Sequence, residues 1–216
     1  MPLNFTTSVN PPKPPVLFAP ANGVLVDGIV PQVLKWNPVL AVTTTNPATT
    51  YPAAKSYEVE YATNTAFIDS TTITTVGAET SPIPLLPGRT YYWRVRSWSD
   101  LNGTGNYSAW SLVRMIKVKF VAPTLTIPGS GATVGVRPTF IWSSAGNGLW
   151  TNYTLQVADN AAFTSGLRSF TITAPITTYT IPATLPALTS GIKYWRVKIN
   201  GPYFPITSVY QSFIVP

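Results

Sequence analysis

The stretch Tyr92-Trp93-Arg94-Val95-Arg96 returns in the second half of the chain as Tyr194-Trp195-Arg196-Val197-Lys198. In both copies apolar and charged side chains alternate, and this period of two predicts a β-strand with one buried and one solvated face. Because a segment repeated at such a distance is the mark of a repeat architecture, the two halves of the chain are expected to fold alike.

Three further pairs of segments match between the halves, and each reads as a short strand or a strand that ends in a turn. They are residues 15–23 with 123–131, residues 33–36 with 139–142, and residues 57–62 with 153–158. Aromatic residues that align between the halves are predicted to lie in the cores: Trp36, Tyr57, Phe67, Trp93, Trp142, Tyr153, Phe163 and Trp195.

Short alternating strands separated by Pro, Gly and Asn turns are typical of a β-sandwich. The 22 prolines are scattered through the 216 residues, so no uninterrupted window would carry a long helix. The sequence therefore predicts an all-β protein of two tandem immunoglobulin-like β-sandwiches. Residues 1–14 are expected to form an N-terminal extended strand with a Pro-rich spacer, residues 15–121 the first domain, and residues 122–216 the second.

The repeat resembles the fibronectin type III family. Residues 31–36 resemble strand B of that family, and its E-to-F corner and strand F are resembled by the stretch Leu85-Leu86-Pro87-Gly88-Arg89-Thr90-Tyr91-Tyr92-Trp93-Arg94-Val95. The likeness covers nearly the whole chain. The tandem arrangement is similar to arrays in bacterial or archaeal surface and secreted proteins. It implies a spacer, adhesive or binding module rather than a particular activity. The second copy is one residue shorter at the corner and lacks a tyrosine aligned with Tyr91.

Catalytic chemistry has few candidates, because the chain contains neither histidine nor cysteine. Disulfides, thiolate metal sites and the usual general bases are therefore absent, and we expect no enzyme, no cofactor and no metal site. Glu58 and Glu60 lie on one face of a predicted strand and could be a glycosidase-like pair. The favoured interpretation is structural: both face Arg94 and Arg96 across neighbouring strands as charge pairs.

The formal charge of +7 is uneven, since residues 122–216 contain five basic residues and Asp159 as their acid. Thr154 and Gln156 are predicted to face Arg196 and Lys198, which leaves a basic face without acids. That face either contacts an anionic polymer or a neighbouring subunit, or is simply solvated. No nucleic-acid motif accompanies the charge, so nucleic acid is not expected as a partner.

Exposed aromatics would be needed for a sugar-binding platform, and the candidates for such a ligand or contact surface are Trp98, Tyr107 and Trp150. Trp110 and Tyr203 are further candidates of the same kind. The first copy is ten residues longer than the second between strands B and C. This insertion, residues 38–55, is predicted to be either a contact loop or a solvated loop.

The segment before the first repeat has the pattern of a detached strand. Leu3, Phe5 and Val9 recur among polar residues, and a stiff Pro-rich spacer follows at residues 11–15. Such a strand is suited to β-strand addition, in which it pairs with a sheet edge of a second copy and produces a filament. The open alternatives are docking in cis or a disordered tail.

These patterns favour a non-catalytic extracellular structural protein, a surface filament or adhesin subunit that assembles through its N-terminal strand and its sheet edges. Its expected partners are other copies of itself, with surface glycan as a second class. The alternatives are a carbohydrate-binding or spacer module of a secreted enzyme, and a virion tail or decoration protein. No stretch is long and apolar enough for a membrane span, so membrane insertion is not expected.

Overall fold

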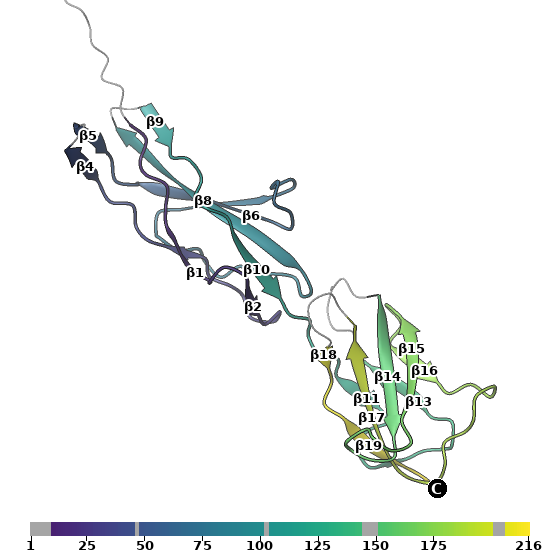
Figure 1. Cartoon of the computed structure of the whole chain (residues 1–216). Coiled ribbons are helices and arrows are strands. Elements are labelled where there is room, and N and C mark those ends of the chain that lie inside the picture. The colour runs from purple at the N-terminus through teal and green to yellow at the C-terminus, as the bar shows by residue number, and fades with distance from the viewer. Residues whose placement is uncertain (1–9, 46–47, 102–103, 144–150, 201–205) are drawn as a thin grey trace, which may run out of the picture. The chain divides into compact units, whose positions relative to one another are not determined.

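The structure is a computed structural model that describes residues 10–45, 48–101, 104–143, 151–200 and 206–216 (Figure 1). The chain divides into two compact units. Val30–Leu85 and Thr90–Lys117 belong to the first, together with the segment that ends at Val26; Val118–Pro216 and two short segments, Asp27–Ile29 and Leu86–Arg89, belong to the second. We refer to them as domain 1 and domain 2. The regular elements of the described residues are β-strands, so the prediction of an all-β protein is confirmed.

Domain 1 is built from two main sheets. The larger has the order β2 (Val24–Val26), β10 (Arg114–Val118), β8 (Thr90–Leu101), β6 (Ser56–Ala62) and β7 (Thr71–Thr75), with β9 (Thr104–Tyr107) paired to β8. The smaller joins β1 (Leu17–Ala19) to β3 (Lys35–Trp36), and the bridges Lys35–Glu79 and Gln32–Ile83 extend it. The core lies between the sheets, because alternate residues of β6 and β8, such as Val59, Trp93 and Val95, point inward and are buried.

Domain 2 repeats this arrangement. Its larger sheet has the order β12 (Ala132–Thr133), β19 (Gln211–Val215), β17 (Gly191–Ile199), β14 (Asn152–Ala158) and β15 (Arg168–Thr173), with β18 (Ile206–Thr207) paired to β17. Its smaller sheet is β11 (Leu125–Ile127), β13 (Thr139–Trp142) and β16 (Thr178–Thr180). The rings of Phe140, Trp195 and Phe213 pack together at the centre of the core.

The predicted core aromatics are confirmed, since all eight are buried. In both domains the tryptophan of the smaller sheet, in β3 or β13, contacts a tyrosine of the larger sheet, in β6 or β14. Trp36 and Tyr57 have ring centroids 5.2 Å apart in domain 1, and the equivalent Trp142 and Tyr153 are 5.5 Å apart in domain 2. Both pairs meet edge to face, a favourable geometry for buried rings.

The insertion of domain 1, expected to be a loop over residues 38–55, contains a pair of antiparallel strands. Its strands are β4 (Val42–Thr45) and β5 (Ala48–Tyr51), paired in antiparallel register with Val42 opposite Tyr51. The physical reason is composition: β-branched and aromatic residues favour extended backbone, and facing threonines can bond across the pair. The hydroxyls of Thr43 and Thr50 do so at 3.2 Å.

Candidate functional site

The outer face of the larger sheet in domain 1 carries two ion pairs in the predicted register. Glu58 lies opposite Arg96, and Glu60 lies opposite Arg94. The guanidinium of Arg94 reaches Oε2 of Glu60 at 2.7 Å, and that of Arg96 reaches Oε1 of Glu58 at 2.6 Å. Ser70 also donates to Glu60 at 2.6 Å. The prediction of cross-strand charge pairs is therefore confirmed, and both carboxylates are engaged in structural contacts.

Aromatic rings stack on the same two arginines. The guanidinium of Arg94 lies 4.0 Å from the ring centroid of Phe67 and 4.4 Å from that of Trp110. That of Arg96 lies 4.0 Å from the ring of Tyr107 and 4.6 Å from that of Trp110. The ring of Trp110 thus contacts both guanidinium groups, and the face of an aromatic ring stabilises positive charge. Phe67, Arg94, Arg96, Tyr107 and Trp110 are together called the arginine–aromatic face.

Of the three predicted contact aromatics, Tyr107 belongs to the arginine–aromatic face and Trp98 adjoins it. Trp98 and Tyr107 are direct partners across β8 and β9. Tyr107 is exposed, whereas Trp98 is only partly exposed because the backbone at Gly105 packs against its ring. A Cβ at Gly105 would lie 2.6 Å from that ring, so only glycine allows this approach. The third candidate, Trp150, lies outside the described residues, as does Tyr203.

Sequence reasoning missed the stacked arrangement, although its signal was present. Arg94 and Arg96 share the outward phase of β8, so a guanidinium ladder on one face follows from the period of two. The position of Trp110 does not follow from any period, because the chain between β9 and β10 is irregular. Two buried serines set it: Ser108 accepts from the Ser97 amide and Ser111 from the Val95 amide, each at 3.0 Å.

The equivalent face of domain 2 has the predicted register without acids. Thr154 lies opposite Lys198, and Gln156 lies opposite Arg196. Arg196 donates to the Gln156 side chain at 2.8 Å and stacks 3.9 Å from the ring centroid of Phe163. Lys198 is half-buried and forms no ion pair with any described residue. Arg196 is therefore held by a ring and an amide rather than by a carboxylate.

The Pro-rich spacer is attached to domain 1 through its described part. Asn10 donates to the Thr50 carbonyl at 3.2 Å, and the Lys13 carbonyl accepts from the Ser97 hydroxyl at 2.8 Å. The Lys13 ammonium also lies 4.9 Å from the ring centroid of Tyr51. The spacer therefore packs against β8 and the inserted pair of strands, a contact that the sequence did not indicate. Leu3, Phe5 and Val9 lie outside the described residues.

An exposed apolar groove runs along β1. Val16 is 66% exposed, Phe18 67% and Leu112 90%. Pro15, Val16, Leu17, Leu112 and Arg114 line a hollow of about 160 Å³ there. The Arg114 guanidinium donates to the carbonyls of Leu17, Phe18 and Pro20 at 2.5 to 2.8 Å, so it covers backbone acceptors along this strand. Apolar side chains, rather than unpaired carbonyls, are what the groove offers to a partner.

The sequence matches no protein-family model and no curated protein. Among solved structures, the chain is similar to a segment of two fibronectin type III domains from chicken tenascin, with a TM-score of 0.55 and 10% identity over 93% of this chain and 98% of that one. The fold is that of tandem fibronectin type III domains. The FN1–FN3 domains of chicken CNTN1 also match, with 17% identity over 95% of this chain and 67% of that one and a TM-score of 0.37.

Likeness at these identities shows the fold and leaves function to the residues. The described residues contain no group of three or more metal-ligating side chains placed to hold an ion. No helix within the described ranges is long and apolar enough to cross a membrane.

Proposed function

We propose that the chain is a non-catalytic extracellular structural protein that assembles with other copies of itself into a filament or adhesin-like array on a bacterial or archaeal cell surface. The segment before Asn10 is the proposed donor, and the groove along β1 of a second copy is the proposed acceptor. The observation that carries the proposal is this groove, in which the exposed side chains of Val16 and Leu112 lie next to Pro15, the last residue of the spacer.

The path of the chain through domain 1 is compatible with assembly into a filament. The spacer contacts Ser97, whereas Lys117 of β10 pairs with Thr90 at the beginning of the same strand β8. Seven residues of strand separate these points, which is about 23 Å. The chain therefore enters domain 1 at one end of β8 and leaves it at the other (Figure 1). Because the proposed donor segment and acceptor groove are different parts of the chain, their contact is heterologous and can continue as a filament rather than close as a dimer.

The two proposed partners match in chemistry. Leu3, Phe5 and Val9 are apolar residues of a short segment otherwise rich in polar side chains. An extended segment places alternate side chains on one face, and these side chains can enter an apolar groove. Val16 and Leu112 are exposed and line one hollow together, and adjoining exposed apolar side chains, unlike single ones, mark an interaction surface.

The experiment compares the intact chain with a variant lacking residues 1–9, by negative-stain electron microscopy and sedimentation over a range of concentrations. The intact chain should form polymers whose length grows with concentration, and the shortened chain should remain monomeric. Leu112→Asp should also abolish polymers, because it places a charge in the groove. Val76→Asp is the matched control, since Val76 is 82% exposed and lies outside the groove. Monomers of the intact chain at every concentration would overturn the proposal.

A second candidate, a glycan-binding module of a secreted protein, is favoured by one specific observation. Tyr107 is exposed and lies beside Trp98, so a ring is available for stacking on a sugar. Glycan binding that is lost in Tyr107→Ala and kept in Leu112→Asp would support this function. An unchanged glycan profile of Tyr107→Ala would exclude this surface as the binding site.

A further inference from the structure

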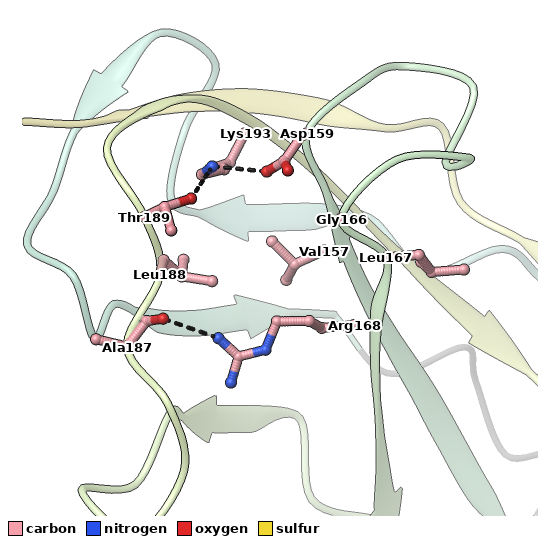
Figure 2. Close-up of a pocket in the computed structure, with 9 residues that line it drawn as sticks. All are labelled: Val157, Asp159, Gly166, Leu167, Arg168, Ala187, Leu188, Thr189 and Lys193. Carbon is pink, nitrogen blue, oxygen red and sulfur yellow. Dashed lines mark hydrogen bonds and ion pairs between the residues drawn. The ribbon is translucent and has the colours of Figure 1, made fainter.

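Domain 2 contains a pocket of about 370 Å³ that the sequence did not indicate (Figure 2). It lies where the end of β14, the beginning of β15 and the segment before β17 meet. Val157 and Leu188 form an apolar floor, and both side chains are buried. Polar groups stand on both sides of that floor: Lys193, Asp159 and Thr189 on one side, and Arg168 on the other (Figure 2). The volume lies within the range of about 300–1,000 Å³ typical of small-molecule sites.

The first polar end is an ion pair between a buried lysine and an exposed aspartate. The Lys193 ammonium donates to Oδ1 of Asp159 at 2.6 Å and to Oγ1 of Thr189 at 2.8 Å. The lysine side chain is only 5% exposed, whereas that of Asp159 is 44% exposed. The ammonium thus fixes one carboxylate oxygen, while the aspartate remains accessible from the pocket. A pre-oriented carboxylate of this kind can accept a hydrogen bond from a ligand hydroxyl.

The loop before β15 is shaped around this carboxylate. Gly166 has a φ of +59°, and a Cβ at this position would collide with Oδ2 of Asp159. Only glycine combines this backbone conformation with such a close approach. The Asp159 amide also donates to the Ser165 carbonyl at 2.9 Å. The aspartate is therefore held by the lysine on one side and by loop backbone on the other.

The second polar end is Arg168. Its Nη1 donates to the Ala187 carbonyl at 3.3 Å, which is long for a hydrogen bond donated by an arginine. A guanidinium has five donor hydrogens, and it forms no ion pair within the described residues. The pocket therefore contains two cations and one anion, so its charged groups carry a net +1. This balance favours a ligand with a single negative charge.

Domain 1 has no equivalent charge arrangement at this corner. Tyr61 and Tyr91 occupy the positions of Val157 and Lys193, and their ring centroids are 6.3 Å apart. Thr63 stands where domain 2 has Asp159. Aromatic rings thus fill in one domain the region that the other leaves as a charged pocket. The sandwich fold does not require the pocket, because the larger sheet of domain 1 has the same strand order without the pocket residues.

We propose that this pocket binds a small hydroxylated carboxylate of the sugar-acid class, as a free uronate or as a uronate unit of an acidic polysaccharide. The ligand carboxylate pairs with the Arg168 guanidinium, whose fork suits a planar anion. Its hydroxyls donate to Asp159 and Thr189, and its C–H face rests on Val157 and Leu188. The proposal is independent of assembly through the N-terminal segment.

The test is a titration of the isotope-labelled full chain, followed by backbone amide NMR signals. The probes are sodium glucuronate, glucose, acetate and an oligogalacturonate. Glucuronate should shift the signals of Gly166 and Thr189 saturably. Glucose and acetate, which lack the carboxylate and the hydroxyls respectively, should bind at least about tenfold more weakly. Tighter binding of the oligomer than of the monosaccharide would identify a polysaccharide as the source.

Three variants make the test specific. Arg168→Gln should weaken glucuronate binding about tenfold by removing a charged hydrogen-bond donor. Lys198→Gln changes the net charge of domain 2 by the same amount outside the pocket and should leave the affinity unchanged. Val157→Tyr introduces the residue of domain 1 and should block the pocket. Equal glucuronate affinity in the Arg168→Gln and original chains, or saturable shifts confined to the face of Arg196 and Lys198, would overturn the proposal.

Discussion

Domain 1 and domain 2 share one strand order but stabilise the same positions with different chemistry. On the outer face, domain 1 pairs Arg94 with Glu60, whereas domain 2 pairs Arg196 with Gln156. In both cases an aromatic ring lies about 4 Å from the guanidinium, Phe67 in one domain and Phe163 in the other. The comparison shows that the ring and the cross-strand register are shared, while the charge of the partner is free to vary.

At the beginning of β8 and of β17, by contrast, the two domains differ in their buried residues. Tyr91 is buried against Tyr61 in domain 1, and Lys193 is buried against Asp159 in domain 2. A buried ring needs no counter-charge, but a buried ammonium does. Domain 2 should therefore depend on one carboxylate in a way that domain 1 does not.

The largest effect is expected from Asp159→Ala. It leaves the Lys193 ammonium buried without its anion, and we expect the free energy of unfolding of domain 2 to fall by about 3 kcal/mol. Urea unfolding, followed by amide NMR signals of each domain separately, measures the change. Domain 1 is the internal reference and should be unaffected.

The double variant Asp159→Ala with Lys193→Met distinguishes the buried charge from lost packing. Removing both charges should recover most of the stability that the single variant loses, because the stranded ammonium is gone. A double variant as unstable as Asp159→Ala would show instead that the aspartate acts through the loop around Gly166. An Asp159→Ala chain of unchanged stability would mean that solvent reaches Lys193 freely.

The next largest effect is expected in domain 1, at the ring that domain 2 lacks. Ser111 accepts from the Val95 amide of β8, and Ser208 accepts from the equivalent Val197 amide of β17. Trp110 therefore corresponds to Thr207. Trp110→Thr removes two cation–π contacts of about 0.5–1 kcal/mol each and some apolar burial, and we expect domain 1 to lose about 2 kcal/mol. Val76→Thr, at an exposed position, should change the stability by less than about 0.5 kcal/mol. Equal losses of stability in the two variants would show that Trp110 contributes nothing to the stability of the arginine–aromatic face.

Much of the fold could be predicted from the sequence because buried and solvated side chains alternate along a strand, so the sequence shows which residues face the core. Glu58 and Glu60 are out of phase with Val59, so their outward direction and their partners followed directly. The buried aromatics followed from the same rule applied to both halves. The repeat strengthened each assignment, since two similar segments rarely share an accidental pattern.

The pocket of domain 2 was missed although part of its signal is periodic. Lys193 is in phase with Trp195 and Val197, so a lysine occupies an inward position of β17. A charge in a core phase predicts a nearby partner of opposite charge. The closeness of Gly166 to Asp159 and the pairing of β4 with β5 depend on loop geometry, which side-chain periodicity does not encode.

The smallest effect is expected from exchanging the partners of the outer arginines. Gln156→Glu gives domain 2 the ion pair of domain 1, and Glu60→Gln gives domain 1 the amide of domain 2. Half-buried pairs of this kind contribute at most about 1 kcal/mol, so each change should shift the urea midpoint of its own domain slightly and in opposite directions. Repeating both measurements at high salt should reduce the two shifts together, because salt screens the ion pair and leaves the amide contact unchanged.

The sign for Gln156→Glu sharpens the comparison further. Gln156 is buried, so a carboxylate there loses hydration before it gains the attraction of Arg196. The expected gain in stability means that the ring of Phe163 and the register of β14 and β17 hold Arg196 well enough for the ion pair to outweigh this loss of hydration. A loss means that desolvation outweighs pairing, and that the amide is the better partner for a guanidinium already stacked on a ring.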